Sequence, residues 1–200
     1  MKFRGINFLL VAGLAVMTSP AWAQSQCDMV SGNLVTNCGF ETGDFTAWSL
    51  GGNTGFTSVS NDDVHSGNFS AQLGPVGSDG TLTQFVGDNS TTYNVSFFLA
   101  DDQSGPDDFT VFWNGVDVGP DLVSDGPFDY TEFSGVLNGN SGAGSNELTF
   151  VFRNDPGFFF LDDIVVTNNG TTPIPEPGSM VLLGSGLLGL AGVMRRKLNF

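Results

Sequence analysis

Short runs rich in Phe, Val and Thr recur along the middle of the chain, separated by clusters of Gly, Asn, Asp and Pro. The clearest runs are residues 55–60, 81–86, 93–100, 109–113, 130–137, 147–153 and 158–166. Several alternate apolar with polar residues, so that Phe109, Val111 and Trp113 fall on one face, as in a strand that covers a core. No stretch between the runs has a sustained helical period. The pattern therefore predicts an all-β fold in which two antiparallel sheets pack into a β-sandwich.

The N-terminus carries a different pattern. Lys2 and Arg4 precede an apolar stretch at 6–17, and a small-x-small pattern ends at Ala23. This order is typical of a secretory signal peptide, which we predict at 1–23 and which cleavage removes. An uncleaved N-terminal anchor is the alternative. The sandwich domain is then expected at 24–170.

The C-terminal tail has three parts. They are the motif Pro175, Glu176 and Pro177, an apolar run at 180–194, and the basic cluster Arg195, Arg196 and Lys197. As a helix the run would reach roughly 22 Å, somewhat short of a ~30 Å hydrocarbon core, and snorkelling basic side chains can make up the difference. The basic cluster would stay on the cytoplasmic side, with the body outside. We therefore predict a Pro-rich linker at 171–179 and a membrane helix with a basic tail at 180–200.

The order of these three parts resembles the PEP-CTERM sorting signal. The resemblance implies that a membrane-embedded sorting protease of the exosortase type recognises the tail. It also implies that the chain is transiently anchored in the inner membrane and then reaches the cell surface or an exopolysaccharide matrix. The residues alone leave a plain C-terminal anchor open as the alternative.

The body is strongly acidic. Of the six Lys and Arg residues of the chain only Arg153 lies in it, and of the 21 Asp and Glu residues all but Glu176 do. Twenty carboxylates against one arginine give a net charge of −19. A domain without a cationic surface cannot bind nucleic acid through its phosphates. Outside the cell, calcium is a natural counterion for such a surface.

Two cysteines, Cys27 and Cys38, lie near the expected mature N-terminus. Because an exported chain meets an oxidising environment, two such cysteines predict one disulfide that closes a short loop. Two free thiols or a metal pair are the alternative, which lacks supporting ligands. By the loop-entropy model such a bond stabilises the fold by about 3 kcal/mol.

Three segments carry a second resemblance. They are residues 33–48, in which Glu41 follows Gly-Phe, the segment His65-Ser66-Gly67, and the run 161–166. In this order they look like the opening, second and closing segments of carbohydrate-binding modules with a galactose-binding-like fold. The resemblance implies that the antiparallel β-sandwich is a jelly roll. The resemblance implies a structural calcium ion between Glu41 and Asp162, with backbone oxygens near Ser66 and Gly67. The alternative is that Glu41 caps a turn and Asp162 faces solvent. A second acidic segment, 101–108, is expected to be a solvated loop rather than a second calcium site.

Candidate sugar-binding residues are aromatic or amide side chains in or beside the predicted strands: Phe98, Trp113, Asn114 and Tyr130. Phe98 shares a strand face with the polar Asn94 and Ser96, where an apolar residue is unexpected. Trp113 ends an apolar stripe, so core packing is the stronger expectation for it.

Catalysis has little support in the sequence. His65 is the only histidine, and no nucleophile-elbow motif is present. We therefore predict a non-catalytic, exported, surface-sorted protein of the cell envelope or exopolysaccharide matrix, associated with glycans and stabilised by calcium. The alternative is a structural or adhesive matrix protein without a specific glycan ligand; a weak glycosidase ranks third.

Overall fold

The computed structural model describes residues 24–87, 90–103, 105–123, 126–139 and 145–169. These residues form eleven strands and one single-turn 3-10 helix, η1 (Cys27–Met29). The strands are β1 (Ser49–Gly52), β2 (Thr57–Ser60), β3 (Ser70–Leu73), β4 (Gly80–Val86), β5 (Thr92–Asp101), β6 (Asp107–Trp113), β7 (Val116–Asp117), β8 (Leu122–Val123), β9 (Phe128–Asn138), β10 (Asn146–Asn154) and β11 (Phe159–Asn168). The predicted all-β class is confirmed.

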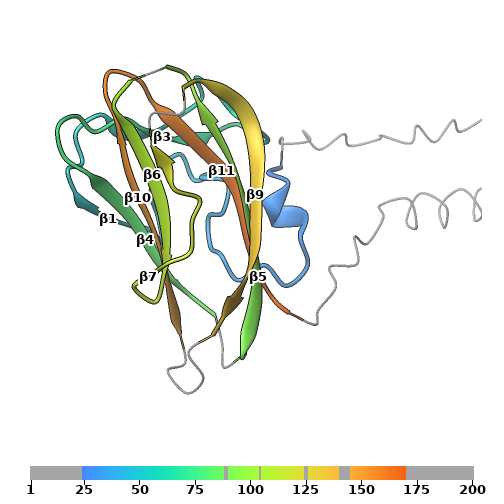
Figure 1. The fold of residues 1–200 in the computed structure, drawn as a ribbon. Coiled ribbons are helices and arrows are strands. Elements are labelled where there is room, and N and C mark those ends of the chain that lie inside the picture. The colour runs from blue at the N-terminus through green and yellow to red at the C-terminus, as the bar shows by residue number, and fades with distance from the viewer. Residues whose placement is uncertain (1–23, 88–89, 104, 124–125, 140–144, 170–200) are drawn as a thin grey trace, which may run out of the picture.

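The strands form two antiparallel sheets that face each other (Figure 1). Sheet A has the order β1-β4-β10-β6-β7, with β8 also paired to β6. Sheet B has the order β2-β3-β11-β5-β9. The β5–β6 and β10–β11 connections lie at one end of the sandwich, the upper end in Figure 1.

The inward faces of both sheets supply the core. Residues alternate between buried and half-buried along β5, β6 and β10, as the period of a strand requires. Aromatic rings join the two sheets: Phe97 of β5 meets Phe150 of β10 edge-on at 5.3 Å, and Phe109 of β6 meets Phe159 of β11 at 5.3 Å. The predicted sandwich therefore closes over a Phe-rich centre.

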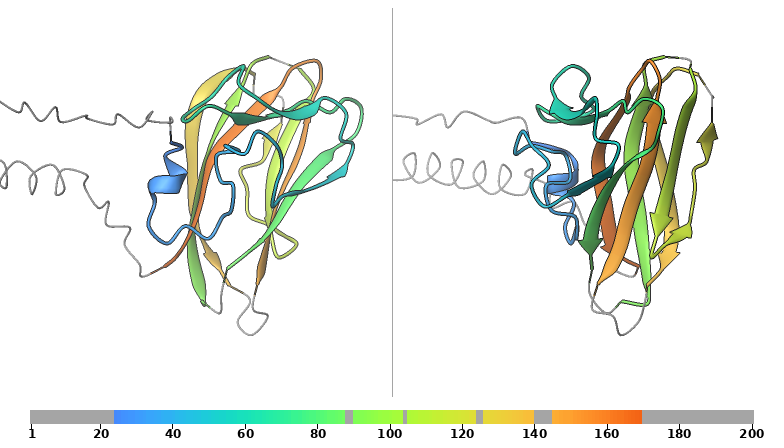
Figure 2. Two further views of the ribbon diagram at one scale, coloured as in Figure 1. Left: turned by 180° about the vertical axis from the view of Figure 1, so that it is seen from behind. Right: turned by 90° about the vertical axis from the view of Figure 1, so that its left-hand side faces the viewer.

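The N-terminal segment, residues 24–38, lies beside sheet B, with η1 on the side away from sheet A (Figure 2). It also reaches sheet A, because Thr36 N donates to Gln84 Oε1 of β4 at 2.8 Å. Leu34 N donates to Val166 O and Ile164 N donates to Cys38 O, so the segment bonds to β11 where the pairing with β3 has ended. The predicted disulfide between Cys27 and Cys38 is present, with an S–S distance of 1.99 Å. It holds the two ends of this segment together.

The predicted signal peptide, linker, sorting motif and membrane helix lie outside the described residues. Within the part of the chain that the structure describes, no helix has the length and apolar character needed to cross a membrane.

Candidate functional site

A β-bulge in β11 places two consecutive carboxylates on the outer side of sheet B. The β5–β11 register shifts between Asp162 and Val165, and Asp163 adopts a φ of 50°. Before the bulge Leu161 faces the core, and after it Ile164 does so. Asp162 lies opposite Phe98, on the outward face, so it does not share the core-facing stripe with Ile164 that a regular strand would give.

Asp163 collects donors from two other segments. Its Oδ1 accepts hydrogen bonds from Ser25 Oγ at 2.5 Å and Cys27 N at 3.0 Å. Its Oδ2 accepts one from Ser66 Oγ at 2.6 Å and lies 2.7 Å from His65 Nδ1. Burial alone would raise the pKa of Asp163, but the hydrogen bonds from Ser25, Ser66, His65 and Cys27 outweigh it and lower this pKa. Asp163 is therefore the charged member of the pair.

Asp162 has the opposite character. It is 0 % exposed. Its Oδ2 accepts from His65 N at 3.0 Å and Ser66 N at 3.1 Å, and its Oδ1 accepts from Asp163 N at 2.7 Å. Burial first, and then repulsion from Asp163, raise the pKa of Asp162 to about 8 despite these bonds. A cation near Asp162 would favour its charged form.

Glu41 binds the same loop, 65–69, at its C-terminal end, whereas Asp162 binds its N-terminal end. Its Oε1 accepts from Asn68 N at 2.8 Å and Phe69 N at 3.1 Å, and its Oε2 accepts from Asn68 Nδ2 at 2.9 Å. A Cβ on Gly67 would lie 2.2 Å from Glu41 Oε1, and Gly67 has a φ of 76°, so only glycine fits there.

The four predicted metal-site residues Glu41, Ser66, Gly67 and Asp162 thus gather around the loop at 65–69. Burial, Glu41 and Asp163 together raise the pKa of nearby Asp28, which shows how much negative charge accumulates in this region. This excess suits a hard cation, although the carboxylate oxygens already receive N–H groups of the loop. Cys27, Asp28 and Cys38 also lie within ligand distance of one another, but the disulfide occupies both sulfur atoms.

Three rings lie beside this loop. The imidazole of His65 stacks on Phe98, with centroids 3.6 Å apart and planes 15° apart, and Tyr130 lies 5.2 Å from the imidazole. Tyr130 Oη donates to Asp63 O at 3.1 Å, which fixes its ring. The structure therefore brings the predicted residues Phe98 and Tyr130 together, with His65 covering one face of Phe98.

Two hollows flank this aromatic group on the outer face of sheet B. One, of about 400 Å³, is lined by residues of β5, β9 and β11 that are both polar (Asn94, Ser96, Glu132, Ser134 and Thr167) and apolar (Val95, Gly135, Val136 and Val165). The other, of about 630 Å³, is lined by Asp63, Ala100, Asp101, Asp102, Pro127, Phe128, Asp129 and Tyr130. The cross-strand pair of Phe98 and Glu132 lies between them. The outer face of β5 and β9 thus combines hydrogen-bonding side chains with aromatic rings and with the exposed Val136.

Trp113 and Asn114 lie elsewhere. Trp113 is 3 % exposed, and its Nε1 donates to Asn138 O at 2.8 Å. It packs in the core, as its apolar stripe predicted, and has no face for a sugar. Asn114 donates to Asn146 Oδ1 and accepts from Glu147 N, both at 2.9 Å, so its amide is used within the fold.

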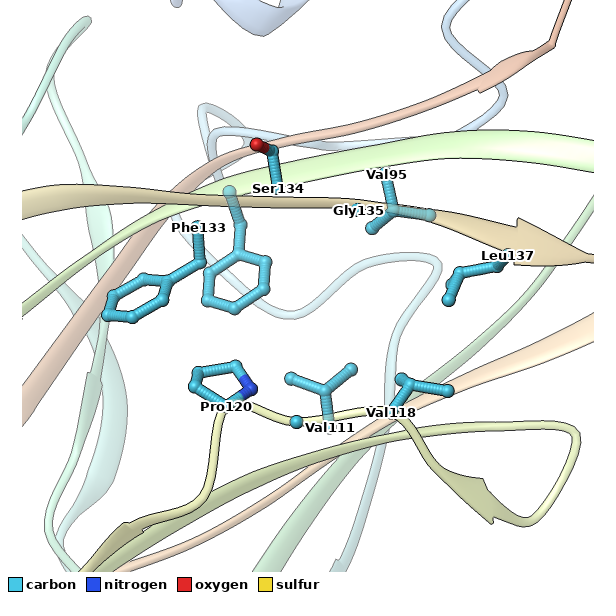
Figure 3. A pocket seen from close by; sticks show the side chains of 10 residues that line it. Val95, Val111, Val118, Pro120, Phe133, Ser134, Gly135 and Leu137 are labelled. Atoms are coloured by element: carbon cyan, nitrogen blue, oxygen red, sulfur yellow. The ribbon is translucent and has the colours of Figure 1, made fainter.

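A third hollow lies between the sheets rather than on their outer faces. It has a volume of about 180 Å³, and Figure 3 shows Val118 and Pro120 facing Phe133 and Leu137 of β9 across it. Most of its lining is aliphatic or aromatic, so a ligand rich in hydroxyl groups would lose hydrogen bonds to water there.

The one histidine does not complete a hydrolytic triad within the described residues. His65 Nδ1 contacts Asp163, but Ser66 Oγ donates to the same carboxylate instead of meeting the imidazole.

Comparison with known proteins identifies the tail and the fold. A family model described as the PEP-CTERM protein-sorting motif matches residues 173–197, so the chain carries this signal, which implies export and a membrane-anchored stage. No curated protein matches the chain.

Among solved structures, a family 61 carbohydrate-binding module in complex with β-1,4-galactotriose has a TM-score of 0.51 and 20 % identity, over 70 % of this chain and 100 % of that one. The family 22 and family 10 modules of a Clostridium thermocellum xylanase, complexed with xylohexaose, give 0.52 and 17 %, over 69 % of this chain and 29 % of that one. At these identities the likeness shows a shared fold: the body is a β-sandwich similar to carbohydrate-binding modules.

Sequence reasoning missed Asp163, the residue with the most contacts around the loop. The sequence feature that could have indicated Asp163 is the pair of adjacent aspartates, Asp162 and Asp163, because two adjacent acids inside an apolar strand indicate a β-bulge or a ligand site. The role of Ser25 had no signal in the sequence.

Proposed function

We propose that the chain is exported and sorted to the cell envelope or exopolysaccharide matrix, where its sandwich binds glycan without catalysing a reaction. The observation that carries this proposal is the outer face of sheet B, where polar side chains alternate with the His65, Phe98 and Tyr130 rings between two hollows. The PEP-CTERM motif supports the export step, and the fold it shares with carbohydrate-binding modules supports the binding step.

The chemistry of this face suits a neutral polysaccharide in extended form. Asn94, Ser96, Glu132 and Ser134 offer donors and acceptors to sugar hydroxyl groups, and the half-buried rings of Tyr130 and His65 offer an apolar contact. A domain with a net charge of −19 repels acidic polymers, so uronate-rich glycans are disfavoured.

A glycan array with the full-length chain in detergent tests the proposal. Ser134→Trp places a bulky ring in the hollow of β9 and should abolish binding of any glycan that the wild type retains. Ser49→Trp is the matched control, because Ser49 is an exposed strand residue of sheet A. Equal binding by both variants, or no saturable binding by the wild type, would overturn the proposal.

The runner-up is a structural matrix protein in which calcium bridges its carboxylates to other acidic polymers. The high negative charge favours it. Aggregation that rises with calcium and shows no preference among glycans would select this function over the first.

We also propose a structural calcium ion at the loop at 65–69, held by Glu41 and Asp162 with help from Ser66 and Gly67. It would neutralise buried charge and tie the N-terminal segment to β11. A ligand that binds only the folded state stabilises it by about 2.7 kcal/mol at a hundredfold excess over Kd. Glu41→Gln and Asp162→Asn should each make the calcium-dependent rise in melting temperature smaller, and the double variant should lose little more than either single one. Full retention of the rise in Glu41→Gln would exclude Glu41 as a ligand.

A further inference from the structure

Two buried carboxylates and a buried amide meet at the end of the sandwich where β5 leads into β6 and β10 into β11. Asp101 ends β5, Asp107 begins β6 and Asn154 ends β10. They are 4 %, 2 % and 0 % exposed. Asn154 lies opposite Asp107 in the β10–β6 register, and its Nδ2 donates to Asp101 Oδ1 at 2.9 Å. The segment at 101–108 is thus not the fully solvated acidic loop that the sequence predicted.

Two oxygen atoms of this cluster receive no hydrogen bond within the described part of the chain. Asp101 Oδ2 and Asn154 Oδ1 are buried and accept no hydrogen bond from the described residues. A Cβ on Gly157 would lie 2.9 Å from Asn154 Oδ1 and 2.6 Å from Asp102 Oδ1, so these two oxygens border one small space. Turning the Asn154 amide over would not help, because it would set the amide oxygen against Asp101 Oδ1.

The one basic side chain of the domain pairs with other carboxylates and not with this cluster. Arg153 is the only Lys or Arg between residues 24 and 170. Its guanidinium lies 3.7 Å from Asp79 Oδ1 and 4.0 Å from Asp108 Oδ2. The alternating burial of β10 places Arg153 and the buried Asn154 on opposite faces of sheet A. The charge of Asp101 is therefore not compensated by a basic side chain of the described residues.

We propose that Asp101, Asp107 and Asn154 bind a calcium ion, with Asp102 at the rim of the site. The available ligands are all oxygen atoms of carboxylate and amide groups, which hard cations prefer. Calcium fits better than magnesium, because magnesium keeps several of its waters and a site this buried leaves little room for them. The ion would hold the β5–β6 and β10–β11 connections together. This site depends neither on glycan binding nor on the Glu41 site at the other loop.

Calcium titration of the chelator-treated, full-length chain in detergent tests the site. The Glu41→Gln variant serves as the background, so that the loop at 65–69 does not contribute. Asp101→Asn and Asp107→Asn each remove one charge with little change of shape. Asp129→Asn is the matched control, because Asp129 is exposed at the same end of the sandwich. Binding is followed by calorimetry and by the shift of the melting temperature, with magnesium as a second probe.

We expect one calcium ion to bind the Glu41→Gln chain, and its dissociation constant to rise at least roughly tenfold in Asp101→Asn and in Asp107→Asn but not in Asp129→Asn. Magnesium should give a much smaller thermal shift. Equal calcium affinity in all three variants would overturn the proposal. The proposal would also be overturned if the Glu41→Gln chain bound no calcium and its Asp101→Asn variant melted at a higher temperature. The buried carboxyl group of Asp101 would then hold a proton instead of binding a metal ion.

Discussion

Replacing Asp163 by glycine should be among the most damaging single changes outside the core. The substitution removes the acceptor for four donors, which come from Ser25, Cys27, His65 and Ser66. Each hydrogen bond to a charged group contributes about 1.5–3 kcal/mol, but part of this returns when the freed hydroxyl groups and imidazole reach water. Breaking a buried charged network typically costs about 3–5 kcal/mol, and we expect a loss in that range.

Urea unfolding at pH 7 measures this loss. The matched control is Ala47→Gly, because Ala47 also has a positive φ, of 72°, and is exposed. Both variants therefore place glycine in a left-handed conformation, and only one removes hydrogen bonds. Asp163→Asn should be intermediate, since its carbonyl can still accept from Ser25 and Cys27. If Asp163→Gly unfolds within about 1 kcal/mol of Ala47→Gly, Asp163 does not hold the three segments together.

Three further predictions concern charge and processing. Hydrogen bonds from Thr46 and Thr42 lower the pKa of Asp44. The charged Asp44 therefore stabilises this turn fully above its ordinary pKa, and the stabilisation is lost as the pH falls through the lowered pKa. Thr46→Val removes the Thr46 hydroxyl, so the Asp44 pKa measured by NMR titration should rise in this variant, and an unchanged pKa would mean that this hydroxyl does not bond to Asp44. The melting temperature should rise with added monovalent salt, because the body has only Arg153 against twenty carboxylates, and a flat salt series would mean that these charges are already compensated. Intact-mass measurement of protein released from the cell surface should show a chain that ends near Pro177, whereas a mass that includes the apolar tail would leave only a plain anchor.

Alternation predicted the long strands because each has one face on the core. Phe109, Val111 and Trp113 are all buried, as period two required. The short strands β1 and β7 had no such signal. β1 has the sequence Ser-Leu-Gly-Gly and is a strand only because it pairs with the edge of β4. Its formation depends on a partner more than 25 residues away, which local propensity cannot show.

The candidate site was harder to predict than the fold. The family-like segments did place Glu41, Ser66 and Asp162 near one another, and Phe98 did stand out as an apolar residue on a polar face. A period of two would put Asp162 on the same face as Ile164, but the bulge at Asp163 adds one residue and places Asp162 on the outward face opposite Phe98. The stacking of His65 on Phe98 joins a loop to a strand, and no spacing in the sequence encodes it.

A domain with a single arginine must satisfy its carboxylates by other means, and here backbone N–H groups do much of that work. Asp162 binds three such groups, Glu41 two, and Asp102 accepts one from Phe158 at 2.7 Å. Hydrogen bonds of this kind favour the charged form and at the same time fix the conformation of the loop that donates them. The loops around the proposed glycan face are therefore ordered by the acidic residues themselves. Where no N–H group is available, as at Asp101 Oδ2 and Asn154 Oδ1, a buried oxygen atom needs a proton, a bound water molecule or a metal ion instead.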